Sequence, residues 1–247
     1  PEAEKAAPAK ASDGPVMYAT FGWGGVMPSE RWAPITVYIT TGDKAVSGSI
    51  LLEYPQDNTQ TAQIAVPFAA TPNRTTPVPI VAALPNLCDE LSLTMFNEGG
   101  RPIRRLRYTR IAGNLTLQLP NMVDSARGLF VGVGRCSLPE SIRVWNDIVG
   151  GMQVEQQAGS PRQLRTPSKD AEQGWNQAQG ASVVIDELPL SWMAYDGVTA
   201  LVVNPDSVGA AGRTVDPRAQ EAVHTWVKSG GRLVIDRLET DVNQIGV

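Results

Sequence analysis

The sequence predicts two domains, an all-β domain followed by an α/β domain, on the basis of three observations. The first half contains short strand-like segments about every ten residues, separated by turn-forming residues. After residue 122 the pattern changes to continuous apolar segments that alternate with helical ones. The length of 247 residues is sufficient for two hydrophobic cores.

Composition and charge exclude several classes of protein. The chain is 42% hydrophobic and 19% charged, as in ordinary globular proteins, and its formal net charge of −4 favours neither nucleic acid nor an anionic membrane. No apolar run approaches the roughly 20 residues of a membrane span. We therefore expect no nucleic-acid partner and no span within this chain.

Residues 1–15 are rich in Ala, Pro, Lys and Glu and cannot form a core. We interpret them as a disordered tether of the kind that follows a removed export signal. This interpretation predicts an exported protein on the periplasmic or cell-surface side.

The first predicted domain spans residues 16–122 and consists of strands. Ile35, Val37 and Ile39 alternate with polar residues, which is the period of a half-buried strand. The segments 46–54, 61–70 and 90–96 show the same alternation. Regular strands with no helical period between them favour an antiparallel, immunoglobulin-like β-sandwich.

An arginine-rich segment lies near the end of this domain. Ile103 lies on odd parity, whereas Leu106 and Tyr108 lie on even parity, so we predict a β-bulge near residues 104–105. The arginines of the segment are Arg101, Arg104, Arg105, Arg107 and Arg110. They could form an anion-binding surface, but we favour an edge strand that charge protects from further pairing.

The second predicted domain spans residues 123–247 and alternates strands with helices. Ser137 and Glu140 form a capping box for a helix, and Asp216-Pro217 begins another. Buried strands are expected at 129–134, 182–186, 198–204 and 232–236. This order predicts a flavodoxin-like, three-layer α/β domain with a mainly parallel sheet. Residues 155–180 form a long polar loop within it.

Several structural motifs resemble those of a known family. They are Leu188-Pro189 with Trp192, Tyr195-Asp196-Gly197, Trp226-Val227 with Gly230 to Leu233, and Arg31-Trp32 with Pro34, Ile35 and Val37. The second half is similar to the class I glutamine amidotransferase-like domains of large bacterial membrane-anchored proteins, in which a β-sandwich can precede that domain. The resemblance implies a segment of a larger protein whose anchor lies elsewhere, with the α/β domain incomplete at its C-terminus.

The catalytic residues of that family are not found at the matching positions. Active amidotransferases place a cysteine after the strand that residues 230–236 resemble, whereas this chain has Asp236-Arg237 there. His224, the single histidine, precedes that strand on the polar side of a helix. We therefore expect a non-catalytic binding or scaffold segment, without a cofactor, for an unknown protein or small-molecule partner.

A glycine-containing turn is one candidate ligand site. Gly132, Gly134, Cys136 and Ser137 lie between a strand and a helix, where backbone amides can hold a phosphate. The third glycine of a dinucleotide fingerprint is absent, so a tight structural turn is the favoured interpretation. We expect Cys136 and Cys88 to be free thiols.

Three carboxylates offer a second candidate site. Asp186, Asp206 and Asp236 each follow a predicted parallel strand, and carboxylates gathered at that sheet edge bind Mg²⁺ in other proteins. A metal-dependent hydrolase or transferase is therefore the alternative function. Strand ends also favour Asp for turn formation alone, and we assign no metal site.

The segment FGWGG at 21–25 raises a third possibility. Trp23 among glycines could stack on a sugar, as in a carbohydrate-binding module. We favour a position for Trp23 in the core or in the seam between the domains.

Overall fold

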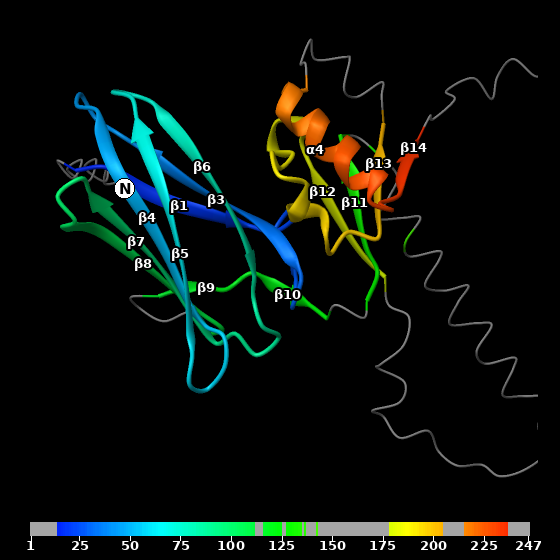
Figure 1. Ribbon diagram of the computed structural model, residues 1–247, viewed down its shortest axis with the longest axis horizontal. Helices are drawn as coiled ribbons and strands as arrows, with labels where there is room; N and C mark the ends of the chain where they lie inside the picture. The colour runs from blue at the N-terminus through cyan, green and yellow to red at the C-terminus, as the bar shows by residue number, and fades with distance from the viewer. Residues whose placement is uncertain are drawn as a thin grey trace, which may run out of the picture.

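The computed structural model describes residues 14–111, 116–124, 127–134, 136, 142, 178–204 and 215–236. These residues form mainly β-strands, arranged as two antiparallel sheets followed by a smaller parallel sheet (Figure 1). Within this described part, no helix is both long enough and apolar enough to cross a membrane.

The first antiparallel sheet has three strands, β1 (Val16–Phe21), β3 (Trp32–Thr40) and β6 (Thr75–Ala83), in the order β1-β3-β6. Its odd-numbered β3 residues are fully buried, whereas the even-numbered ones are partly exposed on the outer face. The alternation of Ile35, Val37 and Ile39 that the sequence showed therefore marks the inner face of this sheet.

The second, mainly antiparallel sheet faces the first across a common core. Its order is β5 (Thr61–Ala70), β4 (Val46–Pro55), β7 (Glu90–Asn97), β8 (Pro102–Thr109) and β9 (Leu117–Gln118), and only β9 is parallel to its neighbour. One cluster of buried apolar side chains joins residues of both sheets, among them Ile35, Ile50 and Leu93. These two sheets form an all-β domain.

The predicted bulge is confirmed, one residue from its expected position. In the pairing of β7 with β8, Met95 is opposite Arg104 and Phe96 is opposite Pro102, so Ile103 is the extra residue. Ile103 nevertheless stays 38% exposed, because the bulge lies near the end of the strand and not over the core.

The parallel sheet contains β11 (Leu129–Val133), β12 (Gln179–Val183), β13 (Ala200–Val203) and β14 (Leu233–Ile235), in the order β12-β11-β13-β14. Val131, Val133 and Leu201 point to one core, while Val202 packs on the opposite face with Ile142. Both faces of the central strands are therefore covered, as their continuous apolar sequences require.

Two short 3₁₀ turns and one helix cover the first of these faces. They are η1 (Ile185–Glu187), η2 (Trp192–Tyr195) and α4 (Pro217–Lys228). Asp216 is the N-cap of α4, with its carboxylate accepting from the Arg218 amide at 2.8 Å and Pro217 at the first helical position. The predicted start of this helix is confirmed.

Two predicted strands of this domain differ from those observed. The strand expected at 182–186 runs from Gln179 to Val183 and stops where η1 turns the chain. The strand at the end of the sheet is not buried as expected, since Leu233, Val234 and Ile235 are all exposed. Among the described residues β14 is an edge strand, paired only with β13.

The predicted helix after Ser137 and the polar loop at 155–180 lie almost wholly outside the described residues. Ile142 is helical and buried, which is the single described position of the helix segment. The same holds for the tether at 1–15, of which the structure describes residues 14–15.

An aromatic seam joins the sandwich to the parallel-sheet domain. Trp23 lies between β1 and the short strand β2 (Val26–Pro28), which pairs in parallel with β10 (Asn121–Val123). Its ring is 1% exposed and 5.0 Å from that of Tyr195, which in turn is 5.6 Å from Trp226 of α4. The preference for a seam position of Trp23 is confirmed, and stacking of its ring on a sugar is wrong because the ring is covered.

Two glycines allow the backbones at the seam to approach closely. A Cβ at Gly24 would lie 2.6 Å from the Ser182 carbonyl oxygen, and one at Gly197 would lie 2.5 Å from Pro28 Cγ. Gly24 also has a φ of +55°, which other residues adopt at a cost. At both glycines the two domains therefore approach so closely that a side chain would not fit.

Candidate functional site

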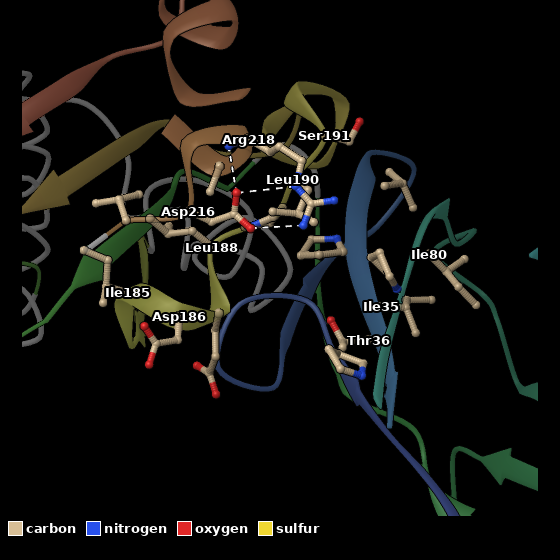
Figure 2. Close-up of a pocket in the computed structure, with 18 of the residues that line it drawn as sticks. Ile35, Thr36, Ile80, Ile185, Asp186, Leu188, Leu190, Ser191, Asp216 and Arg218 are labelled. Carbon is tan, nitrogen blue, oxygen red and sulfur yellow. Dashed lines mark hydrogen bonds and ion pairs between the residues drawn. The ribbon is translucent and has the colours of Figure 1, made fainter. Parts of the chain in front are cut away.

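A groove of about 1010 Å³ lies between the sandwich and the parallel-sheet domain (Figure 2). One wall comes from β3 and β6, and the other from η1, the segment 188–191 and the beginning of α4. In Figure 2, Thr36 and Ile80 belong to the first wall, and Asp186 and Arg218 to the second. Its volume is at the upper end of the range for ligand sites.

The sandwich wall is built from the outward-facing side chains of two neighbouring strands. The pleat places Pro34, Thr36 and Tyr38 of β3 on the outer face, and the register sets Pro79 opposite Thr36 and Pro77 opposite Tyr38. These side chains are short or flat. The wall therefore offers a smooth, mainly apolar surface with few hydrogen-bond donors.

The opposite wall carries the charges of the groove. Asp186 and Glu187 lie on η1, whereas Asp216 and Arg218 lie at the start of α4. The Arg218 guanidinium contacts the Asp216 carboxylate at 3.1 Å. With three carboxylates and one guanidinium, the lining has a formal excess of two negative charges.

A second hollow of about 320 Å³ adjoins the groove beside β1. Both are lined by Pro34, Thr36, Tyr38 and Glu187, so the two hollows are neighbours. Tyr38 stacks on Tyr18 with ring centroids 4.8 Å apart, which extends the flat surface across β1. We call the two hollows together the interdomain groove.

The electrostatics of the groove act on Tyr38 and Asp216. Burial raises the pKa of Tyr38, the Thr20 hydroxyl opposes this shift, and the nearby Glu187 carboxylate raises the pKa further. The geometry agrees with this coupling, because Glu187 and Tyr38 both line the two hollows. The hydrogen bonds from the Arg218 side chain and amide lower the pKa of Asp216 below its ordinary value.

The described glycines of the candidate phosphate turn have their backbone amides engaged in the sheet, in keeping with the structural turn that sequence analysis favoured. Gly132 is paired on both sides within β11, and the Gly134 amide donates to the Val183 carbonyl at 3.0 Å. Cys136 is half-buried beside Ile142. Ser137 lies outside the described residues.

Two of the three candidate carboxylates, Asp186 and Asp236, are described, and they lie at opposite ends of the sheet. Asp186 follows β12 and Asp236 follows β14, with β11 and β13 between them. At about 4.8 Å per strand these positions are roughly 14 Å apart, too far to share one ion. Asp206 lies outside the described residues, and no metal-binding group of three or more His, Cys, Asp or Glu occurs within them.

Three arginines in or directly after β8 make polar contacts with β7 and the turn before it. Arg107 contacts Glu90 at 2.5 Å, and Arg110 contacts Asp89 at 3.1 Å. Arg105 donates to the Ser92 hydroxyl at 3.2 Å. Beyond the two residues of β9, β8 is an edge among the described strands, as the charge-protected interpretation of Arg101, Arg104, Arg105 and Arg107 expects.

The remaining nucleophile and base candidates lie apart from the groove. Cys88 and Cys136 are free thiols, and burial raises the pKa of Cys88 to about 11. His224 is on the exposed side of α4, 3.9 Å from Glu221. None of the three lines the interdomain groove.

Sequence analysis did not identify the interdomain groove as a site, although it named one of its lining residues, Asp186, as a candidate. The walls of the larger hollow come from four separate segments near residues 34–38, 77–81, 185–191 and 215–219. A signal existed in the first two, because prolines at 34, 77 and 79 occupy the positions that alternate with the buried residues of their strands. Proline within a strand marks an edge strand, a strand end or a bulge, where no hydrogen-bond donor is needed.

Comparisons with known proteins give little guidance. No family model matches the sequence, and no curated protein matches it. Among solved structures, the chain is similar to a Paenibacillus sp. cycloisomaltooligosaccharide glucanotransferase complexed with cycloisomaltoheptaose, with 12% sequence identity and a TM-score of 0.26. The match covers 88% of this chain and 27% of that enzyme. A TM-score of this size carries no argument, so the site is interpreted from its own residues.

Proposed function

We propose that this chain is a non-catalytic binding segment of a larger exported, membrane-anchored bacterial protein, and that its ligand occupies the interdomain groove. The observation that carries the proposal is the pair of unlike walls, one smooth and rich in proline and one bearing carboxylates. Such a combination of apolar surface and a few placed charges is typical of binding sites.

The domain types in this proposal are an immunoglobulin-like sandwich and a degenerate, flavodoxin-like amidotransferase domain. The two facing antiparallel sheets support the first. The order β12-β11-β13-β14 supports the second, because it equals the order of the first four strands of a flavodoxin-like sheet.

The absence of catalysis is proposed from the position that follows β14. An amidotransferase-like nucleophile would lie there, and this chain has Asp236, whose amide continues the sheet by donating to the Val203 carbonyl at 2.9 Å. Glutaminase activity that disappears on replacement of Cys136 would contradict this part of the proposal.

The binding role is tested by selection from a random peptide display library and by a glycan array. The variant Thr36→Trp fills the groove, because Thr36 lines both hollows. Thr40→Trp is the matched control on the same strand and face, outside the groove.

We expect ligands that bind the wild type and Thr40→Trp but not Thr36→Trp. Ligands that bind all three proteins equally would place the binding surface elsewhere. A lack of any selected ligand in both formats would overturn the proposed function.

A further inference from the structure

The edge of β6 that faces away from β3 cannot pair with another strand at Pro77 and Pro79. The Gly22 amide donates to the Pro34 carbonyl at 2.7 Å, so even-numbered residues of β3 turn their backbone groups to β1 and odd-numbered ones to β6. By the register, Pro77 and Pro79 then turn their nitrogens to the open edge. A proline nitrogen has no hydrogen to donate, so strand addition is blocked there.

The chemistry of the two walls then limits the ligand. The sandwich wall presents prolines and the Tyr38 ring, a surface suited to a polyproline II segment, whose ridges fit grooves lined by aromatic and proline side chains. Such a segment already has its bound shape and loses little entropy on binding.

The negative charge of the groove determines whether a cationic or an anionic ligand is favoured. Arg218 is paired with Asp216, whereas Glu187 lies near Tyr38, and these two residues line both hollows. An anionic ligand would meet like charge, and a neutral one could donate hydrogen bonds to the carboxylates but would gain no charge attraction. A cation held over the aromatic wall gains from both.

We infer that the interdomain groove binds an extended, proline-rich peptide that carries lysine or arginine, with Tyr38 and the prolines contacting its ridges and Glu187 contacting its cation. This inference rests on the proposed binding function and specifies its ligand.

The test is calorimetric titration at low salt with a synthetic peptide of repeated Lys-Pro-Pro triplets. Because polyproline II repeats every three residues, this peptide places its lysines along one ridge. Peptides of Glu-Pro-Pro and of Lys-Ser-Gly triplets control for charge and for shape. We expect binding of the first peptide alone, weakened by added salt.

Three variants examine the charges. Glu187→Gln keeps an oxygen for the Val184 amide but removes the charge, and we expect about fivefold weaker binding. Glu221→Gln, a matched change on the exposed side of α4, should leave the affinity unchanged. Arg218→Gln removes the cation beside Asp216 and should strengthen binding, a gain that damage to the fold does not produce.

The outcomes separate the inference from the proposed function. If the groove-dependent ligands of the display library or glycan array are acidic peptides or glycans, the inference fails and the binding function stands. Equal affinity of wild type and Glu187→Gln for the Lys-Pro-Pro peptide also overturns the inference. Absence of every groove-dependent ligand overturns both.

Discussion

The seam and the interdomain groove lie between the same two domains, but the first is closed by packed side chains and the second is open. At the seam, Trp23, Tyr195 and Trp226 pack in sequence, and glycines bring the backbones together. In the groove, the facing residues are mainly prolines, aliphatic side chains and carboxylates, together with Tyr38, and they leave about 1010 Å³ open. Large aromatic rings in mutual contact close the first region, whereas the two walls of the second stay apart.

This difference teaches how a site stays open between two domains. The seam fixes their separation, because Trp23, Tyr195 and Trp226 are buried and their rings are in contact. The groove then cannot collapse, although its walls are largely apolar. Stability should therefore depend on the seam, and binding on the groove.

Trp23→Ala should give the largest effect on stability. Removing a fully buried indole leaves a cavity beside Tyr195, and the expected loss is about 3–5 kcal/mol of unfolding free energy. Trp32→Ala is the control, with a side chain 40% exposed and an expected loss of about 1 kcal/mol or less. Urea denaturation of both variants measures this, and equal losses would refute a special role for the seam.

The stabilities of Gly24→Ala and Gly25→Ala can be compared to measure the cost of separating the two backbones at the seam. Both glycines have positive φ, so each alanine adds a backbone strain of about 1–2 kcal/mol. Only the Cβ at Gly24 meets the Ser182 carbonyl, while nothing lies within 4 Å of one at Gly25. We expect Gly24→Ala to lose about 1–3 kcal/mol more in the same denaturation assay. Identical values would mean that the backbones separate without cost.

Thr36→Trp should change stability little, although it adds an indole. Its side chain enters open space in the groove and displaces no core residue, so the expected change is within about 0.5 kcal/mol. Thermal unfolding provides the measurement. A large loss would show that the groove wall is as closely packed as the seam.

Asp216→Asn should have the smallest effect, and one that depends on pH. Hydrogen bonds from Arg218 lower the pKa of Asp216 in the folded state below its ordinary value of 3.8. The charged carboxylate therefore stabilises the fold at pH values above 3.8. This stabilisation is lost as the pH falls through the lower pKa of the folded state. Asn keeps the cap without the charge. The difference in denaturation midpoint between wild type and variant should therefore shrink on acidification, and a constant difference would contradict the assignment.

Local patterns in the sequence predicted much of the fold. The alternation of Ile35, Val37 and Ile39 predicted the inner face of a strand. The shift in alternation after Ile103 predicted a bulge, and Asp216-Pro217 predicted the start of a helix. Each depends on residues close together in the chain. The exposure of β14 was not predictable in this way, because an apolar strand has the same sequence at the edge of a sheet as at its centre.

The interdomain groove was not predictable for a related reason. Tyr38 and Glu187 are far apart in the sequence, and only the packing of the two domains places them near one another. The aspartates that sequence analysis considered as a candidate cluster do not come together in the described residues, because strand order, which local patterns do not encode, separates Asp186 from Asp236.

The position of Trp23 makes the unit of unfolding larger than either domain. Trp23 and Val26 precede almost all of the sandwich in the chain, yet both belong to the core of the parallel-sheet domain. That core is thus incomplete until the beginning of the chain has joined it. A boundary at residue 123 therefore divides the sequence without dividing the unit that unfolds. The whole described structure should melt in one transition, whose calorimetric enthalpy equals its van't Hoff enthalpy.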